Sequence, residues 1–581
     1  MSARAEIVEF LASRHGFGSD GGCKTVVTHI STVLLIGERA IKLKHPVRLP
    51  YLDFSTPERR LQACLDELRL NRRTAPTLYR AVHRITREAD GRLALNGQGR
   101  LEDAVVEMAR FDERTLFDRL AREGRLSLDD ADALAKAIAA LHGDAQPVAG
   151  AGAERMARVL ALNETALRDV ALFGPCEVQP IILACRQELE RLQERLDQRA
   201  RAGFVRRCHG DLHLRNICKV DGAPTLFDCL EFSEELATTD ILYDLAFVLM
   251  DLWRRKLPVH ANTLFNRYVD ETGDEAGAAL LPFFMAVRAM VRAHVTAAEI
   301  GATELSCAWI RSEARSYLAL ARDLLAIRPA SLVAIGGFSG SGKSSVATRI
   351  APQIGPAPGA RILASDRIRK HLFGVPAETP LGAEAYAPAL SETVYETALA
   401  CADIVLAAGH AVICEAVFDR PSARAAVETL AQRRGVPFRP LWLEAPADLL
   451  MRRVAARRHD PSDATPEVVM SQLAKPTPPH DWPRLCTTGD LETVCEAAQL
   501  ATDVQVTISL AAPCAQMRIP SRALAPLTCA RALAKVEARP PSGARTVGAD
   551  GLLRAGATPT VLSLVEETDR RPGSPRPRPP G

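Results

Sequence analysis

Two stretches of the 581-residue chain combine residue types that hold phosphate groups, and they lie in different halves of the sequence. The first runs from His209 to Asn216 and reads HGDLHLRN, with an aspartate and an asparagine at D-x4-N spacing. The second runs from Gly337 to Ser344 and reads GFSGSGKS, the G-x4-G-K-S pattern of a Walker A phosphate loop. Because each pattern is a known solution to holding a nucleoside triphosphate with its Mg²⁺, the sequence predicts two nucleotide sites.

In the second half, the glycines of the loop allow backbone N–H groups to converge on phosphate oxygens. The Lys343 side chain is expected to reach the β and γ oxygens, and the Ser344 hydroxyl to ligate Mg²⁺ at the start of a helix. The predicted nucleotide contacts are Gly337, Phe338, Ser339, Gly340, Ser341, Gly342, Lys343, Ser344 and Ser345.

Three further features of the second half could take part in phosphoryl transfer. Asp366 follows a strand-like segment and opens a helical one, so it could cap the helix, act as a base toward a substrate hydroxyl, or do both. Glu415 lies in the strand-like run VICE, where it would contact Mg²⁺ or its water, or be an edge charge. Arg453 and Arg457 could neutralise a transferring phosphate, or could simply lie on a solvated basic helix.

Several segments of this half together resemble the small P-loop kinases of the adenylate-kinase-like and gluconate-kinase-like group. They are GFSGSGKS, SDRIRKHL, VICEAVF, LWLEAP and MRRVAARRHDPSDAT. The resemblance covers about residues 331–500 and implies an ATP-dependent kinase that acts on a small molecule or on a nucleotide-like hydroxyl. The chain has Glu415 where members commonly carry aspartate, which keeps the charge.

In the first half, the chemistry of phosphoryl transfer assigns a role to each acidic or amide side chain. Asp211 suits the carboxylate that orients an attacking hydroxyl, and Asn216 and Asp228 suit metal ligands. The segment 217–228 is expected to be a hairpin with its turn at 221–224, which would place Asp228 beside the 211–216 loop. A metallohydrolase using the two histidines of HGDLH is the alternative, but no further histidine pair at suitable spacing supports it.

These residues, with FDCLEF at 227–232 and DILYDLA at 240–246, resemble the aminoglycoside phosphotransferase family, which has a protein-kinase-like fold. The resemblance covers about residues 20–320. It implies that Asp211 is the catalytic base, that Asn216 and Asp228 bind magnesium, and that Asp244 supports the loop.

An ATP-holding lysine is then required on an amino-terminal strand. Lys42 is favoured over Lys44, which shares its strand face, and Glu67 is the expected ion-pair partner. The glycines between residues 16 and 22 do not form a regular glycine-rich loop.

The order of the two halves resembles a bacterial fusion of an aminoglycoside phosphotransferase-like domain with a P-loop kinase domain described as an AAA family ATPase. The first family serves choline, homoserine, sugars and other hydroxyl acceptors, so the resemblance does not determine the substrate.

The elements that must position these residues also differ between the halves. Strand patterns at 24–37, 39–44 and 101–108, a helix from Pro57 with one apolar face at Leu61, Leu65 and Leu68, and a helical body over 115–324 predict a two-lobed α+β domain. Strands at 331–337, 361–365, 411–418 and 438–445 alternate with helices and predict a parallel three-layer α/β domain.

The predicted domain bounds follow from these patterns. They are 1–325 for the kinase-like domain, 326–506 for the P-loop kinase domain and 507–581 for a Pro/Arg-rich tail. From residue 511 onward the tail has 11 Lys and Arg against 5 Asp and Glu and little apolar surface to bury, so we expect it to be largely disordered.

Composition limits the class of protein. The formal charge of +3 argues against a nucleic-acid partner, and residues 1–20 contain no continuous apolar stretch of a secretory signal. The fourteen cysteines form no C-x-x-C pair, which fits a reducing compartment. We therefore expect a cytoplasmic protein without a membrane partner, and the sequence leaves its oligomeric state open.

The predicted function is an ATP- and Mg²⁺-dependent phosphotransferase acting on a small hydroxylated molecule. Two alternatives stay open at this point. One is a regulatory ATP-binding protein whose amino-terminal half is a pseudokinase, and the other is a polynucleotide 5′-kinase, which also uses a phosphate loop and an aspartate at the position of Asp366.

Overall fold

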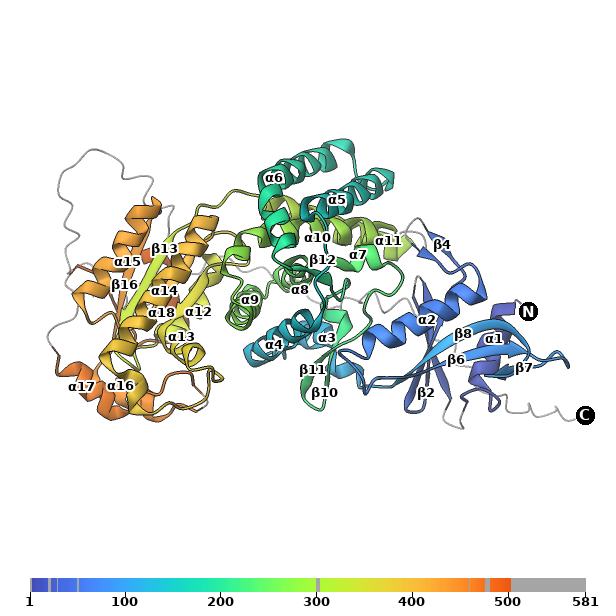
Figure 1. The fold of residues 1–581 in the computed structure, drawn as a ribbon, viewed down its shortest axis with the longest axis horizontal. Coiled ribbons are helices and arrows are strands. Elements are labelled where there is room, and N and C mark those ends of the chain that lie inside the picture. Colours follow the sequence, from blue (N-terminus) through green and yellow to red (C-terminus); the bar gives the residue numbers. More distant parts are fainter. Residues whose placement is uncertain are drawn as a thin grey trace, which may run out of the picture. The chain divides into compact units, whose positions relative to one another are not determined.

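The computed structural model describes residues 3–18, 22–28, 30–49, 52–298, 304–458, 460–475 and 481–502, which all belong to one compact unit (Figure 1). The tail predicted at 507–581 lies outside the described residues. A helical, mostly buried body follows an amino-terminal sheet, and a parallel sheet follows that body in the chain. The two-lobed α+β and α/β fold classes predicted from the sequence are confirmed.

The amino-terminal lobe is an antiparallel sheet of six strands in the order β1-β2-β3-β8-β6-β7. The strands are β1 (Cys23–Val27), β2 (Ser31–Ile36), β3 (Arg39–Lys44), β6 (Tyr79–Arg87), β7 (Leu93–Leu95) and β8 (Arg100–Ala109). The strand expected over 24–37 is in fact two strands paired as a hairpin, with Val27 opposite Thr32. The expected turn at residues 37 and 38 joins β2 to β3, and the sequence prediction missed β6 and β7.

Helix α2 (Pro57–Asn71) packs against this sheet, and α1 (Ala3–Ala12) begins the lobe. The Thr56 side chain accepts a hydrogen bond from the Arg59 N–H and Pro57 occupies the first turn, which is why the helix begins there. Two residues of the predicted apolar face, Leu61 and Leu68, pack against the buried cluster of the lobe, whereas Leu65 is 45% exposed and does not. The buried face also carries Cys64 and Glu67, since the helix turns a carboxylate toward the lysines of β3.

The carboxy-terminal lobe is helical and contains two short two-stranded sheets. Its helices are α3 (Phe117–Arg122), α4 (Leu128–Asp144), α5 (Gly152–Asp169), α6 (Pro175–Arg201), α7 (Glu234–Ala237), α8 (Ile241–Arg254), α9 (Pro258–Thr272), α10 (Leu281–Ala298) and α11 (Glu304–Leu324). Its strands are β9 (Val205–Arg207), β10 (Ile217–Val220), β11 (Ala223–Leu226) and β12 (Thr238–Asp240).

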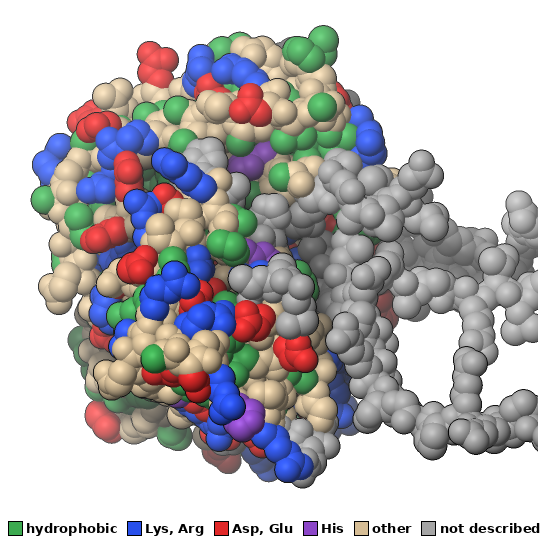
Figure 2. Space-filling view, turned by 90° about the vertical axis from the view of Figure 1, so that its right-hand side faces the viewer, with side chains coloured by type: hydrophobic (Ala, Val, Ile, Leu, Met, Phe, Trp, Pro, Cys, Tyr) green, Lys and Arg blue, Asp and Glu red, His purple; other side chains and the backbone are tan. Residues whose placement is uncertain are grey.

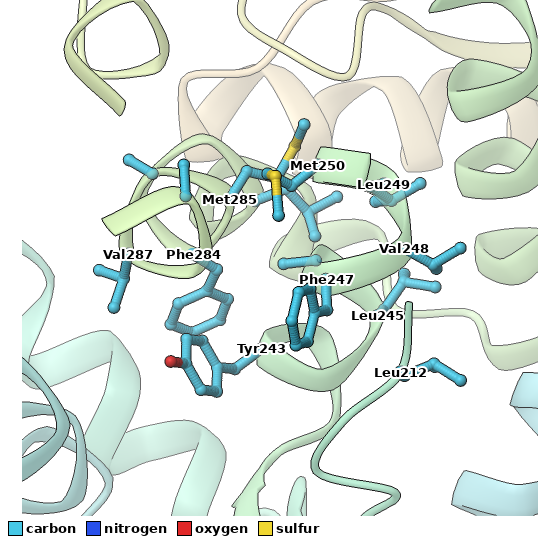
Figure 3. Close-up of a cluster of buried hydrophobic side chains, with 14 of the residues drawn as sticks. Leu212, Tyr243, Leu245, Phe247, Val248, Leu249, Met250, Phe284, Met285 and Val287 are labelled. Carbon is cyan, nitrogen blue, oxygen red and sulfur yellow. The ribbon is translucent and has the colours of Figure 1, made fainter. Parts of the chain in front are cut away.

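Helices α8 and α10 form the centre of this lobe. Tyr243 and Phe247 of α8 and Phe284 of α10 belong to one buried cluster (Figure 3), and Leu212 of the 209–216 loop is part of the same cluster. All four side chains are at most 2% exposed. The loop predicted to do chemistry is therefore anchored to the core through its leucine.

The segment Glu275–Ala298 is long and apolar enough to cross a membrane by length and composition, and among the described residues it is the one such candidate. Because 72% of its apolar window is buried inside the lobe, it packs as a core helix of this lobe.

The second domain has a fully parallel sheet of five strands in the order β14-β15-β13-β16-β17. The strands are β13 (Leu332–Gly337), β14 (Arg361–Ala364), β15 (Val412–Glu415), β16 (Phe438–Glu444) and β17 (Arg484–Cys486), the last of which the sequence prediction missed. The helices are α12 (Lys343–Ile350), α13 (Ser365–Leu372), α14 (Pro388–Ala408), α15 (Pro421–Arg434), α16 (Ala447–Ala455), α17 (Pro466–Leu473) and α18 (Leu491–Thr502). Separate apolar clusters on the two faces of the sheet give the three-layer arrangement.

Basic and acidic side chains are interspersed over the face of the molecule drawn in Figure 2. Such mixing agrees with the small net charge of the chain.

Candidate active sites

The first site lies where the amino-terminal sheet meets the hairpin β10–β11. Asp221 and Gly222 both have positive φ, so the turn of this hairpin has two residues and is shorter than the predicted 221–224. Asp228 follows the hairpin with φ 62°, and its N–H donates to the Tyr79 hydroxyl. This left-handed backbone turns the Asp228 side chain toward β3.

Lys42 and Asp228, 186 positions apart in the chain, meet in this site. The Lys42 Nζ donates to Asp228 Oδ1 at 2.5 Å and to Glu67 Oε1 at 2.9 Å. The structure thus brings together the lysine, its helix partner and a predicted metal ligand. Lys44 also contacts Glu67, at 2.5 Å, but its second partner is Glu231 rather than Asp228.

The lysines change the ionisation of the buried carboxyl between them. Burial alone would raise the pKa of Glu67, but the positive charges of Lys42 and Lys44 outweigh burial and lower that pKa to about 2. Sequence reasoning assigned no role to Glu231, although it lies in the quoted FDCLEF segment. The carboxylates of Glu67 and Glu231 compensate the positive charges of the two neighbouring buried lysines, Lys42 and Lys44.

Asp211 and Asn216 form the other wall of the first site. The Asn216 amide donates to Asp211 Oδ2 and to the Asp211 carbonyl, both at 2.9 Å. His213 Nε2 lies 3.5 Å from Asp211 Oδ2. Burial would raise the pKa of Asp211, but nearby positive groups, His213 first among them, outweigh it and lower that pKa. The ionised carboxylate suits proton acceptance.

Two carboxylates of α8 accept hydrogen bonds from backbone N–H groups of the 209–216 loop. Asp244 accepts the N–H groups of His209, at 3.0 Å, and Gly210, at 2.8 Å. Asp251 accepts the Leu214 N–H at 3.1 Å. Asp244 therefore lies where the family resemblance placed a supporting residue, and Asp251 is a second support that sequence reasoning missed.

The second site is built on the turn between β13 and α12. Gly337, Gly340 and Gly342 all have positive φ between 85° and 143°. A Cβ on Gly337 would lie 2.5 Å from the Leu443 carbonyl oxygen, and one on Gly340 would lie 2.5 Å from the Leu450 carbonyl oxygen. Glycine is therefore required at these positions, and the loop can present its N–H groups to phosphate oxygens.

Ser344 and Glu415 meet at the start of α12. The Ser344 hydroxyl donates to Glu415 Oε1 at 2.6 Å, and the other carboxylate oxygen of Glu415 is buried without a hydrogen-bond partner among the described residues. Burial raises the pKa of Glu415 despite the nearby Lys343. A hydroxyl and a carboxylate with a spare oxygen are a donor set that fits Mg²⁺.

Lys343 donates to the Phe338 carbonyl oxygen at 3.2 Å, and no carboxylate of the described residues lies within ion-pair distance of it. Burial lowers the pKa of the Lys343 ammonium. The lysine therefore keeps its charge available for phosphate rather than using it in an ion pair.

Asp366 lies in the first turn of α13 and interacts electrostatically with Lys343. The N-cap residue of this helix is Ala364. The capping role considered for Asp366 is therefore wrong. Its carboxylate accepts no hydrogen bond from the described residues, so it is free to accept one from a substrate hydroxyl.

The arginines of α16 and the residues after it divide between two faces. Arg453 donates to the Gly340 carbonyl and to Thr487, while the Arg457 NH1 is buried without a partner. Arg452 and Arg458 are exposed, so the four arginines do not share one face. Arg453 braces the loop and Arg457 is the one with a donor to offer.

Two features of this site had no signal in the sequence reasoning. Gln472 of α17 bonds the loop twice, accepting the Ser339 N–H at 2.8 Å and donating to the Ser339 hydroxyl at 3.2 Å. Asp463 accepts hydrogen bonds from Lys370, from the Tyr386 hydroxyl at 2.6 Å and from the Leu381 N–H at 3.1 Å. Only the folded chain joins these segments.

Comparison with known proteins agrees with the two-domain order. Residues 51–281 match the model of the phosphotransferase enzyme family, and residues 332–479 match the model of an AAA domain. The chain therefore carries an aminoglycoside phosphotransferase-type domain followed by a P-loop kinase-like domain, as the sequence predicted.

An uncharacterized protein of Mycobacterium tuberculosis is 29% identical over 479 residues, which cover 78% of this chain and 90% of that protein. The corresponding uncharacterized protein of Mycobacterium bovis matches to the same extent. The two-domain arrangement is thus shared along nearly the whole length of these relatives.

Solved structures match parts of the chain. A choline/ethanolamine kinase family protein from Mesorhizobium loti is 13% identical, covers 56% of this chain and 100% of its own, and has a TM-score of 0.33. A gluconokinase from Sinorhizobium meliloti is 22% identical, covers 30% of this chain and 93% of its own, and has a TM-score of 0.22. Scores at this level carry no argument about substrate.

Proposed function

We propose that the protein is an ATP- and Mg²⁺-dependent phosphotransferase with two nucleotide sites, each transferring the γ-phosphoryl group to the hydroxyl of a small molecule. The family matches establish the coarser class, a phosphotransferase, and the site chemistry supports the rest. The observation that carries the proposal is the Ser344–Glu415 contact, because it leaves a buried carboxylate oxygen without a partner beside an unpaired lysine.

In the P-loop site, Ser344 and Glu415 would hold Mg²⁺ and the loop N–H groups would hold the phosphates. Bound Mg²⁺ supplies charge neutralisation on the β and γ phosphates. Asp366 would accept the proton of the acceptor hydroxyl while the oxygen of that hydroxyl forms a bond to the γ phosphorus. The bond from that phosphorus to the β–γ bridging oxygen breaks, and ADP leaves with the electron pair.

In the kinase-like site, Asn216 and Asp228 would hold Mg²⁺ and Lys42 would bind phosphate. Asp228 now pairs with Lys42 at 2.5 Å, so nucleotide binding must exchange this ion pair for contacts to phosphate and metal. Asp211 would accept the proton of the acceptor hydroxyl, and the same bonds form and break as in the P-loop site.

The test counts nucleotide sites in the full-length protein. Calorimetric titration with a non-hydrolysable ATP analogue and Mg²⁺ is expected to give two sites per wild-type chain. Lys343→Ala removes the main phosphate cation of one site and Asp228→Asn the metal charge of the other, so each variant should retain one site.

A wild-type stoichiometry of one that falls to zero in Lys343→Ala would overturn the two-site proposal and favour an amino-terminal pseudokinase. ADP release against a panel of hydroxylated metabolites and single-stranded oligonucleotides then separates a small-molecule kinase from a polynucleotide 5′-kinase. We propose a cytoplasmic small-molecule kinase and expect no turnover with oligonucleotides.

A further inference from the structure

Two arginines of α10, Arg288 and Arg292, lie on the face of the helix beside the proposed catalytic loop, and the function proposed above does not account for Arg292. Arg288 of α10 donates to the Gly210 carbonyl at 3.2 Å, one residue before Asp211. Arg288 is 6% exposed, and its NH2 lies 3.7 Å from Asp244 Oδ1 but has no hydrogen-bond partner among the described residues. Its guanidinium carbon lies 3.9 Å from the ring centre of Tyr243, so packing holds it in place.

Arg292 lies one helical turn further along the same face of α10. The Arg288–Gly210 hydrogen bond shows that this face of α10 lies against the proposed catalytic loop, so Arg292 lies on the loop side of the helix. Its contact partner is Tyr317 of α11, whose ring centre lies 5.7 Å from the guanidinium carbon.

The carboxylates near Arg292 already have partners. Asp251 pairs with Arg255 at 2.9 Å, and Glu313 pairs with Arg254 at 3.0 Å. None of the carboxylates in the described part of the chain lies within ion-pair distance of Arg292 itself. This guanidinium is therefore a cation near the proposed catalytic loop that no acid of the described chain neutralises by direct contact.

A second arginine, whose charge Glu313 already balances, contacts the same Tyr317 ring as Arg292. The Arg254 guanidinium carbon lies 4.1 Å from the ring centre of Tyr317, so two arginines contact one ring, and the Nε of Arg254 is buried without a partner. The His213 Nδ1 is also buried without a partner beside the loop. Buried polar atoms left open in this way are costly unless a ligand satisfies them.

We propose that Arg292 is a specificity-determining residue and that the acceptor of the kinase-like domain carries an oxyanion, a carboxylate or a phosphate, close to the hydroxyl that is phosphorylated. A guanidinium binds such a group through two parallel hydrogen bonds, whereas a polycationic acceptor would be repelled. This inference rests on the proposed function and names the acceptor class of the same site.

The test compares acceptors on the full-length protein, with Asp211→Asn as the background for each. Glycerol, glycerol 3-phosphate and glycerate form a matched neutral and anionic series, and an aminoglycoside represents polycations. We expect Asp211-dependent ADP release with anionic acceptors at least ten times higher than with neutral or cationic ones. Arg292→Gln should raise the KM of the anionic acceptor at least tenfold and leave the KM of ATP unchanged.

The matched control is Arg322→Gln on α11, whose side chain is 71% exposed, and it should behave as the wild type. A preference for neutral or cationic acceptors would overturn the inference while leaving the phosphotransferase function intact.

If no compound is phosphorylated, binding decides. Inorganic phosphate titrated into the Lys343→Ala protein, which removes the phosphate loop as a competitor, should bind and should lose at least tenfold in affinity on adding Arg292→Gln. Equal binding with and without Arg292 would sink the oxyanion site, whereas the predicted loss would support it even though the proposed activity had failed.

Discussion

At the scale of single residues, the two sites differ in how they hold their lysine before a nucleotide binds. Lys42 is paired with two carboxylates, whereas Lys343 donates to a backbone carbonyl and has no ion-pair partner among the described residues. Nucleotide binding would therefore require breaking an ion pair in the first site but not in the second. The same contrast applies to the proposed bases, since Asp211 accepts the Asn216 amide while Asp366 accepts no hydrogen bond from the described residues.

The free carboxylate of Asp366 leads to a residue-scale prediction. Asp366→Asn in the full-length protein should lower the rate of transfer by the P-loop site by about 100-fold or more, because a general base is lost. The affinity for the ATP analogue should change less than twofold. Single-turnover ADP formation and calorimetry check the two quantities, with the 70% exposed Asp448→Asn as the matched control. An equal loss of ATP affinity would mean that Asp366 serves the nucleotide instead.

At the scale of elements, two buried carboxylates of helix α8 hold the 209–216 loop. Burial alone would raise the pKa of Asp244, but the hydrogen bond from His142 and the charges of His209 and Arg288 lower it to about 2. For Asp251, burial is likewise outweighed, chiefly by Arg255, and the pKa is again about 2. The hydrogen bonds that the loop N–H groups donate are thus accepted by ionised carboxylates.

This arrangement predicts how stability depends on pH. A folded pKa of about 2, below the unfolded value of about 3.9, means that the stabilisation is fully present above pH ~4 and is lost as pH falls toward 2. Each carboxylate should contribute about 2 kcal/mol over that window. Asp244→Asn should therefore show lower stability at pH 7 and a flatter decline between pH 4 and 2.

Urea unfolding at a series of pH values, followed by circular dichroism, measures this dependence. Exposed Asp323→Asn is the control, since its side chain is 67% exposed. A decline in Asp244→Asn as steep as in the wild type would contradict the assignment of the loop support.

At the scale of the whole molecule, the kinase-like and P-loop domains share a buried polar contact. Arg361, at the start of β14, binds Glu275 at 2.8 Å and Asp270 at 2.7 Å and is 4% exposed. Asn262 of α9 donates to the carbonyl oxygens of Pro358 and Ala360. Since β14 leads directly into α13, this contact also bears on the helix that carries Asp366.

Replacing Arg361 should weaken this contact between the two domains. Arg361→Met leaves two acids without their cation, and breaking a buried ion pair costs about 3–5 kcal/mol. We expect the Tm of the full-length protein to fall by several degrees and transfer by the P-loop site to slow. Scanning calorimetry with exposed Arg452→Met as control measures the effect. An unchanged Tm would show that the two domains do not depend on each other.

What the sequence by itself determined is local in the chain. The phosphate loop, the HGDLHLRN segment and the alternation of strands and helices are contiguous patterns, so backbone geometry and side-chain periodicity identify them without tertiary information. Predictions that relied on a broad apolar pattern were less accurate. The single strand predicted over 24–37 is a hairpin of two strands. The apolar face predicted for α2 included Leu65, which is exposed, because burial depends on which neighbouring element packs against a helix.

The tertiary structure alone decided which distant residues meet. It paired Lys42 with Asp228, joined Gln472 to Ser339, and placed Arg288 against the 209–216 loop. It also separated the arginines that follow one another near residue 453 into two faces. Such contacts depend on how sheets and helices pack around a shared core, and packing is a property of the folded chain that no short stretch of sequence records.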